Sequence, residues 1–594
     1  MDTTKDIVNN KAVKFKKLTH ITKLSQHPSI YHIIQIVLNN HFDNLSDIII
    51  FTRICKQITI KYIQPFVKQI LIKNSTLVNL SKLQRFTNLQ SLDIFRCHQI
   101  TDISTFEYLT NLKTLGMFWC NRIPDIIIFK YLTKLQTLDI SGCPQITDIT
   151  ALQSLINLQT LGMSWCTQIT DITALIHLTN LRKLYMNNCN QITNINAFRN
   201  LFNLHTLHMN RCTQITDITA LGCLTNLQLL DIRGCSGITN ITALQTLTKL
   251  QTLNMRDCVK ITNIIALENL IHLHTLDICR CYQISNINSL RHLTKLQILN
   301  IGDCYEITDI HILKYLTNLQ SFIMYACDKI TDITALQYLT NLHSLSIHYC
   351  ENLIDITALQ YLTNLQSLNM FGHEQISVLQ NLTNLQSLNI SFGEQITDIT
   401  VLTNLTKLHS LDMSYCEQIT DITPLQCLTN LQSLDIRMCT EITDITPLKN
   451  LTNLRKLYMS ECTEITDITP LENLTNLQLL HISGCNKLTD ITALQNLTNL
   501  QILYMGWCDN MTDITALQNL TNLQKLYFDG CPKITDIITS QHLNNLQTLD
   551  IISCKQIVNI SGLNHRIDLQ NLRINNNIKI CKLKNIINFN TLYY

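Results

Sequence analysis

Residues 428–450 read LTNLQSLDIRMCTEITDITPLKN, and this stretch of 23 residues decides how the chain folds. The pattern L-T-N-L-Q-S-L-D-I-x-x-C-x-x-I-T-D-I-T-x-L-x-x recurs along the chain almost without interruption. A fixed period of about 20 to 50 residues is the signature of a repeat architecture, in which equivalent structural repeats stack on one another. The sequence therefore predicts an open-ended array, because 594 residues exceed what one closed core organises.

A cysteine marks the period of the array. Steps of 23 residues without an insertion connect twelve of them: Cys97, Cys120, Cys143, Cys166, Cys189, Cys212, Cys235, Cys258, Cys281, Cys304, Cys327 and Cys350. His373 holds the next place, and a shortened repeat of 20 residues leads to Gly393. The step of 23 then continues through seven more: Cys416, Cys439, Cys462, Cys485, Cys508, Cys531 and Cys554. One further step to Asn577 predicts about 22 repeats in residues 69–594.

Each repeat combines a strand with a short helical segment. Apolar residues alternate in Leu431–Ile436, as they do in a short strand with one buried face. In Thr446-Pro447-Leu448 the threonine suits a helix N-cap and the proline suits the first helical position. We therefore expect strand, turn, short helix or 3₁₀ segment and return loop, in that order. No repeat can bury its own leucines, so its stability must come from stacked neighbours.

These repeats resemble leucine-rich repeats, whose pattern L-x-x-L-x-L-x-x-N/C-x-L matches Leu431, Leu434, Ile436, Cys439 and Ile442. The I-T-D-I-T-x-L half resembles the short repeats of bacterial internalins and of a phosphatase regulatory subunit. The cysteine resembles the variant that is common in F-box leucine-rich-repeat proteins. The resemblance covers about four-fifths of the chain. It implies an α/β fold, a curved horseshoe with a parallel sheet on the concave face and short helical or 3₁₀ segments on the convex face.

Charge and hydropathy exclude several classes of partner. The chain has 45 Lys and Arg against 43 Asp and Glu, so it lacks the basic excess of a nucleic-acid-binding protein. No stretch has the roughly 18 uncharged apolar residues of a membrane span. The polar segment from Met1 to Lys17 lacks the apolar centre of a signal peptide. We expect neither nucleic acid nor a membrane as a partner.

The cysteines predict a compartment. Nineteen of the 24 lie at the position that marks the repeat, so they form a file of thiols rather than crosslinked pairs. We expect these thiols to point inward, pack as small apolar groups and donate weak hydrogen bonds to loop carbonyls. Free thiols belong in a reducing environment, so the sequence predicts a cytoplasmic protein without a disulfide framework.

The sequence offers no ground for an active site. It contains no phosphate loop, no G-x-S-x-G, no H-E-x-x-H and no C-x-x-C, so we expect neither an enzyme nor a cofactor. The recurring aspartate of I-T-D-I, as at Asp148 and Asp444, is predicted to cap nearby backbone N–H groups. Calcium is the alternative ligand of this aspartate, but Asn194 and Asn240 replace it in other repeats, which favours capping.

Aromatic side chains predict where a partner binds. Positions between the buried residues of the strand half should face the concave side, and all three tryptophans fall there, each directly before the cysteine position. Exposed aromatic patches often mark binding surfaces. The predicted partner-binding residues form two regions: Phe95, Phe118, Trp119 and Trp165 near the start, and Tyr458, Tyr504, Trp507 and Tyr527 near the end. The alternative is that these rings only cover the sheet.

Residues 1–68 lack the repeat and are predicted to be α-helical. Residues 47–56, DIIIFTRICK, resemble the second helix of an F-box, although His27 replaces the usual leucine before the proline. The resemblance implies docking to a Skp-family adaptor and a role as the substrate-recognition subunit of an SCF-type ubiquitin ligase. The adaptor-binding residues would be Pro28, Ile34, Val37, Ile54 and Cys55.

Two readings of residues 1–68 remain open. A helical cap over the first repeat is the alternative to an F-box, because the open end of a solenoid needs a cover. The chain would then be a cytoplasmic scaffold or regulatory subunit with no link to ubiquitin. The composition, rich in Ile, Asn and Lys, also resembles repeat families encoded by giant DNA viruses.

Overall fold

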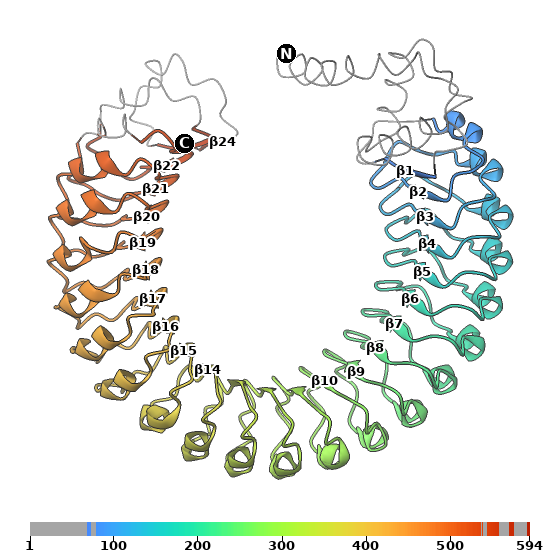
Figure 1. Cartoon of the computed structure of the whole chain (residues 1–594), viewed down its shortest axis with the longest axis horizontal. Helices are drawn as coiled ribbons and strands as arrows, with labels where there is room; N and C mark the ends of the chain where they lie inside the picture. Colours follow the sequence, from blue (N-terminus) through green and yellow to red (C-terminus); the bar gives the residue numbers. More distant parts are fainter. Residues whose placement is uncertain are drawn as a thin grey trace, which may run out of the picture. The chain divides into compact units, whose positions relative to one another are not determined.

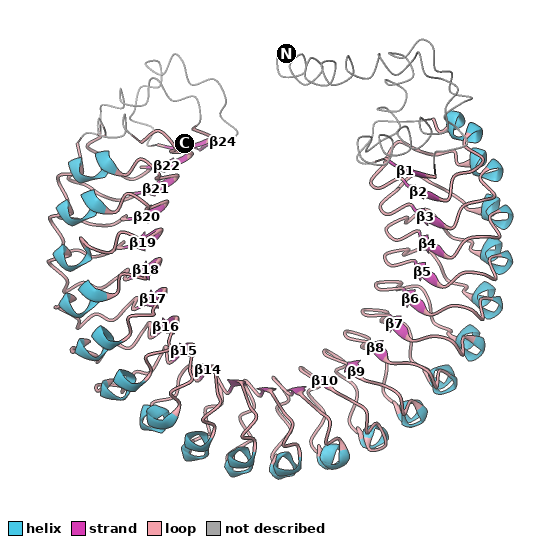
Figure 2. Cartoon of the chain, viewed as in Figure 1, coloured by secondary structure: helices cyan, strands magenta, loops and turns pink. Residues whose placement is uncertain are grey.

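The computed structural model describes residues 68–72, 79–535, 537, 543–557 and 569–574 together with the backbone of 591–593. The chain divides into two compact units, residues 1–296 and 297–594, which we call the N-terminal half and the C-terminal half. Within each half, strands stack along one side of the repeats and 3₁₀ helices along the opposite side (Figure 1; Figure 2). The predicted F-box residues Pro28, Ile34, Val37, Ile54 and Cys55 lie outside the described residues.

The N-terminal half contains ten described strands and ten 3₁₀ helices. The strands are β1 (Gln69–Leu71), β2 (Ser91–Asp93), β3 (Thr114–Gly116), β4 (Thr137–Asp139), β5 (Thr160–Gly162), β6 (Lys183–Tyr185), β7 (Thr206–His208), β8 (Leu229–Asp231), β9 (Thr252–Asn254) and β10 (Thr275–Asp277). The 3₁₀ helices are η3 (Ser81–Arg85), η4 (Ser104–Tyr108), η5 (Ile127–Tyr131), η6 (Thr150–Ser154), η7 (Thr173–His177), η8 (Asn196–Asn200), η9 (Thr219–Cys223), η10 (Thr242–Thr246), η11 (Ile265–Leu267) and η12 (Asn288–His292).

The C-terminal half continues the same order of elements. Its described strands are β11 (Ile298–Asn300), β12 (Ser321–Ile323), β13 (Ser344–Ser346), β14 (Ser367–Asn369), β15 (Ser387–Asn389), β16 (Ser410–Asp412), β17 (Ser433–Asp435), β18 (Lys456–Tyr458), β19 (Leu479–His481), β20 (Ile502–Tyr504), β21 (Lys525–Tyr527), β22 (Thr548–Asp550), β23 (Asn571–Arg573) and β24 (Thr591–Tyr593). Its 3₁₀ helices are η13 (His311–Tyr315), η14 (Thr334–Tyr338), η15 (Thr357–Tyr361), η16 (Ile376–Asn381), η17 (Thr400–Asn404), η18 (Thr423–Cys427), η19 (Thr446–Asn450), η20 (Thr469–Leu471), η21 (Thr492–Asn496) and η22 (Thr515–Asn519).

Neighbouring strands within each half pair in parallel and in one register. Leu434 of β17 lies opposite Leu411 of β16 and Leu457 of β18, so equivalent residues of successive repeats form columns. The repeat of β17 contributes eight side chains to the interior that are at most 1% exposed: Leu428, Leu431, Leu434, Ile436, Cys439, Ile442, Ile445 and Leu448. Full burial of one such aliphatic side chain contributes about 1.5–3 kcal/mol, and the neighbouring repeats supply the surface that buries it.

The helical segments are 3₁₀ helices, which is one of the two forms that we had predicted. The Leu448 N–H donates to the carbonyl of Ile445 at 2.9 Å, and the Leu451 N–H donates to Leu448 at 2.9 Å. Both bonds join residues three apart, which is the 3₁₀ pattern, and a segment of only five residues suits this tighter helix.

The predicted threonine cap was wrong, whereas the predicted aspartate cap is confirmed. Thr446 is the first residue of η19, and the side chain of the preceding Ile445 makes no cap bond. Instead the Thr446 backbone N–H donates to Asp444 Oδ1 at 2.7 Å. Asn194 accepts in the same way from the Asn196 N–H at 2.8 Å. The residue at the N-cap is apolar, so the first backbone N–H of the helix donates instead to the side chain that lies two residues earlier in the chain.

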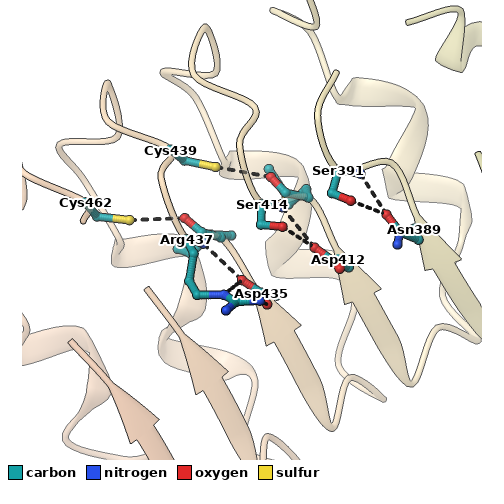
Figure 3. Close-up of polar contacts among 10 residues, drawn as sticks. Asn389, Ser391, Asp412, Ser414, Asp435, Arg437, Cys439 and Cys462 are labelled. Carbon is teal, nitrogen blue, oxygen red and sulfur yellow. Dashed lines mark hydrogen bonds and ion pairs between the residues drawn. The ribbon is translucent and has the colours of Figure 1, made fainter. Parts of the chain in front are cut away.

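The inward thiols are confirmed, and each one connects two repeats. Cys439 Sγ donates to the Met413 carbonyl at 3.2 Å, and Cys462 Sγ donates to the Ile436 carbonyl at 3.1 Å (Figure 3). In both cases the acceptor lies 26 residues earlier, in the preceding repeat. His373 takes over this bond where the cysteine is missing, because its Nε2 lies 3.0 Å from the Ile347 carbonyl.

A second ladder joins the return loops. Asn453 Nδ2 donates to the Thr429 carbonyl at 2.9 Å, and Asn476 Nδ2 donates to the Thr452 carbonyl at 2.9 Å. These asparagines belong to the L-T-N-L segment of each repeat. The loop carbonyls of one repeat are therefore satisfied by side chains of the next, which specifies the stacking register.

The shortened repeat loses its residues between the strand and the 3₁₀ helix. Leu368 of β14 still pairs with Leu388 of β15, so the missing residues leave the strand register unchanged. The segment before η16 is shorter, and this helix starts at Ile376 without the I-T-D-I-T cap. The shortening therefore affects only the side of the repeat that follows the strand.

Thiol reactivity tests this packing. Burial raises the pKa of the Cys143 thiol to about 12, so at pH 8 the thiol is neutral and shielded. We expect an alkylating reagent to modify the exposed Cys427 in the native protein while the buried ladder thiols stay unmodified. Denaturation should expose nearly all of them. Mass spectrometry distinguishes the two states, and disulfide bonds among most ladder cysteines would contradict the packing.

Candidate protein-binding surfaces

Four side chains of each repeat reach the strand face or the turn that ends it. In the repeat of β3, Thr114 and Gly116 flank the buried Leu115, and Phe118 and Trp119 form the turn that follows. We name these four places the first strand position, the last strand position, the first turn position and the second turn position. The residue that marks the period, normally cysteine, follows the second turn position and is buried.

The second turn position has left-handed backbone geometry, which we had not predicted. Trp119, Trp165 and Trp507 have φ angles of 60°, 61° and 57°. These tryptophans therefore lie in the turn. We had predicted that they lie on the strand. Five repeats carry glycine at this place: Gly142, Gly234, Gly372, Gly484 and Gly530. That recurrence was the signal in the sequence, because glycine alone adopts positive φ without steric cost.

The N-terminal half brings its four predicted aromatic residues together. Phe95 and Phe118 stack with ring centroids 5.4 Å apart, and Trp119 meets the edge of Phe118 at 5.9 Å. Trp119 and Trp165 belong to repeats that are not adjacent, yet their rings lie 6.4 Å apart. Gly142 in the intervening repeat makes this possible, because a Cβ atom there would come within 2.8 Å of Trp119 Cδ2. We name this group the N-terminal aromatic cluster.

In the C-terminal half, three predicted residues occupy the last strand position. Tyr504 and Tyr527 stack at 4.5 Å, and His481 lies between Tyr504 and Tyr458 at 4.9 and 6.4 Å from them. Trp507 occupies a turn instead, and among the described residues no ring contact joins it to these tyrosines. We name the three tyrosines and His481 the tyrosine column. His481 was not predicted, although it has the same place in its repeat as the tyrosines.

A third group of rings was missed entirely. It is the longest of the three and consists of Tyr325, His348, Tyr349, Phe371, Phe392 and Tyr415. Successive centroids lie 4.1 to 5.4 Å apart, and the group extends across the shortened repeat. Burial lowers the pKa of His348, which favours a neutral ring in the stack. We name this group the central aromatic ladder.

Polar residues at the last strand position cap the strand ends. Asn389 Oδ1 accepts from the Ser391 N–H at 2.8 Å, and Asp412 Oδ1 accepts from the Ser414 N–H at 3.0 Å (Figure 3). Asp435 adds a paired contact, because Arg437 donates to it through Nε at 2.9 Å and Nη2 at 2.6 Å. This bond to Asp435 raises the pKa of Arg437. Much of the polar strand face therefore holds the turns in place.

Replacement of residues at the second turn position tests its geometry. Ala326 has a φ of 51°, and left-handed geometry costs a non-glycine residue about 1–2 kcal/mol. We expect Ala326→Gly to raise the free energy of unfolding by about 0.5–1 kcal/mol after the entropy of the freer unfolded chain is subtracted. Gly372→Ala should lower it by about 1 kcal/mol, although no atom lies within 4 Å of the added methyl group.

Urea denaturation or hydrogen exchange measures both changes. Ala335→Gly in η14 is the matched control, because Ala335 is not among the residues with positive φ and its replacement by glycine should destabilise. Destabilisation by Ala326→Gly would contradict the geometry.

Four leucine-rich-repeat families match the sequence. They are "Leucine-rich repeat region" at residues 164–395, "Leucine Rich repeats (2 copies)" at 383–427, 406–450, 429–473 and 452–496, "Plant disease resistance protein RPS2-like, leucine-rich repeats" at 56–213, and "BspA type Leucine rich repeat region (6 copies)" at 483–592. The chain is a leucine-rich-repeat protein. The predicted α/β leucine-rich-repeat solenoid is thereby confirmed. None of these families describes an F-box or a viral protein, so both remain predictions.

Solved structures include similar chains. An internalin (inlF) from Listeria monocytogenes is 32% identical over 55% of this chain and 89% of its own, with a TM-score of 0.46. TLR13 in complex with ssRNA13 is 20% identical over 88% of this chain and 84% of its own, with a TM-score of 0.55, a likeness of fold alone. Comparison with curated protein sequences finds no match.

In the described part of the leucine-rich-repeat protein, no helix has the length and apolar character to cross a membrane. Among the same residues, no three His, Cys, Asp or Glu side chains are grouped so that they could hold a metal ion.

Proposed function

We propose that this leucine-rich-repeat protein is a non-enzymatic scaffold that binds a protein partner through the exposed rings of its strands and strand-end turns. One observation carries the proposal. Trp119, Trp165 and Trp507 occupy left-handed positions where glycine is favoured on steric grounds. Folding alone does not explain a bulky ring there, and Trp507 is 59% exposed. Backbone strain of this kind is retained where a side chain serves a function.

The arrangement of the rings supports the same proposal. Stacked tryptophans and tyrosines present large rigid surfaces, and such residues dominate the energy of protein interfaces. The N-terminal aromatic cluster and the tyrosine column each span several repeats, which suits a partner that contacts an extended surface. The free thiols favour a reducing compartment for this binding, and we therefore propose a cytoplasmic location.

Removal of the indoles tests the binding role. We expect Trp119→Ala with Trp165→Ala to cost about 2 kcal/mol or more of binding energy, as truncation of an interface hot spot does. Both positions keep a non-glycine residue, so the backbone strain is unchanged. Tyr131→Ala is the matched control, because Tyr131 is an exposed ring on η5, opposite the strands.

The measurement is affinity capture with the immobilised full chain. A partner held by the wild type and by Tyr131→Ala should be lost from the double variant. Equal capture by all three chains would contradict the role of the N-terminal aromatic cluster.

We further propose that the chain is the substrate-recognition subunit of an SCF-type ubiquitin ligase, in which residues 28–58 dock a Skp-family adaptor. The resemblance of residues 47–56 to the second F-box helix supports this proposal, as do the cysteine-type repeats that follow. A scaffold with no ubiquitin link remains the alternative, with residues 1–68 acting as a cap.

Adaptor binding separates the two alternatives. We expect a Skp-family adaptor to bind the full chain and to be lost on Ile34→Asp, because an unpaired carboxylate in a desolvated contact costs several kcal/mol. Trp119→Ala should leave adaptor binding unchanged. A pull-down with the purified adaptor measures this. If the wild-type chain binds no Skp-family adaptor, the cap with a plain scaffold is the correct description.

A further inference from the structure

The C-terminal half has a pocket at the shortened repeat. Its volume is about 490 Å³, and it is lined by Tyr349, Ile354, Phe371, Glu351 and Glu374 among others. The position of Ile354 is occupied by threonine in most repeats, as in Ile330-Thr331-Asp332-Ile333. Ile354 is 80% exposed, more than any other large apolar side chain in the described part of the chain. Ile354 lines the same pocket as the rings of Tyr349 and Phe371, and such contiguous exposed apolar surface marks interaction sites.

The central aromatic ladder forms one wall of this pocket. Tyr349 and Phe371 line the pocket and lie 4.6 Å apart, and Phe371 continues to Phe392 at 4.5 Å. The ladder then ends at Tyr415, which stacks on Phe392 at 4.1 Å. Tyr349, Phe392 and Tyr415 all occupy the second turn position, and each has a positive φ. The strain that marks the tryptophans therefore recurs here in three of four consecutive repeats.

The surface around the pocket is acidic. Residues 330–406 contain no Lys or Arg, and their six carboxylates are Asp332, Glu351, Asp355, Glu374, Glu394 and Asp398. Four successive repeats place an exposed glutamate directly after the residue that marks the period: Glu351, Glu374, Glu394 and Glu417. Within the described residues, none of these four forms an ion pair. Three repeats thus share a pattern of three residues, in which an aromatic residue is followed by a buried residue and then by a glutamate, as in Tyr415-Cys416-Glu417.

We propose that the pocket and the central aromatic ladder bind a basic peptide segment of the protein partner. Lys or Arg side chains pack their stems on the rings, and their charges are attracted both by the ring faces and by the glutamates. One apolar side chain of the same segment enters the pocket beside Ile354. This inference rests on the proposed function of protein binding and adds the chemistry of the partner. Anionic ligands are disfavoured, because residues 330–406 contain six carboxylates and no Lys or Arg.

A synthetic peptide tests the inference directly. The probe is a fluorescent peptide of nine residues with Lys and Arg around a central Leu, and its counterpart carries Glu in place of each basic residue. We expect the full chain to bind the basic peptide in fluorescence anisotropy, more weakly as salt rises, and to bind the acidic peptide not at all. Binding of both peptides, or of neither, would overturn the proposal.

Matched variants locate the binding surface. Glu374→Gln with Glu394→Gln should weaken binding by about fivefold to tenfold and reduce its salt dependence. Glu441→Gln with Glu472→Gln removes the same charge from exposed positions outside the surface and should change the affinity less than about twofold. Equal losses in the two double variants would show a general charge effect and refute this site.

Ile354→Thr tests the apolar contact without risk to the fold, because threonine occupies this position in most repeats. We expect it to weaken binding about threefold to tenfold at every salt concentration. An unchanged affinity would remove the pocket from the proposal. The outcome is separable from that of the proposed function, which is tested at Trp119 and Trp165. If the wild-type chain captures a partner but does not bind the basic peptide, the inference about the basic segment is wrong and the proposed protein-binding function stands.

Discussion

The stacking of each repeat on the one before it is the constraint on which the rest of this structure depends. Eight side chains per repeat are buried, yet a single repeat has no second layer to bury them. The hydrogen bonds follow the same rule. Cys439 donates to a carbonyl 26 residues earlier, and Asn453 donates to one 24 residues earlier. Every interior bond of this kind crosses from one repeat to its neighbour, so stability is a sum of nearest-neighbour interfaces.

The common register of the strands places the same position of successive repeats side by side, so these positions together form one surface. Because equivalent residues lie in columns, an aromatic residue at the same place in successive repeats stacks on its neighbours, as Tyr504 does on Tyr527. An irregular repeat changes the structure only locally, because each repeat contacts only its neighbours. A pocket beside Ile354 lies at the repeat that lacks three residues after His373, and the pairing of β14 with β15 is intact there.

The turn after each strand carries different side chains from one repeat to the next. Its second position is left-handed in every described repeat from Arg96 to Gly530, and glycine would be the least costly choice. Most repeats have another residue there, including all three tryptophans, Phe392 and Tyr415. A side chain other than glycine costs the fold some strain here, which supports the proposal that the rings of these turns bind a partner. The same turns carry the rings of all three tryptophans and much of the central aromatic ladder.

The sequence by itself determined the period, the short strand, the presence of a short helical segment, the buried thiols and the capping role of Asp444. Each of these depends on residues within one repeat or on strict recurrence, which a single sequence displays. Only the tertiary structure decided that the tryptophans lie in turns, that Trp119 reaches Trp165 across Gly142, and that a ring ladder crosses the shortened repeat. The ladder was hidden because its rings fall at two different turn positions and because the shortened repeat places Phe371 and Phe392 21 residues apart rather than 24. Contacts between repeats depend on backbone geometry and on the residue that the neighbour supplies, and neither follows from the pattern of one repeat.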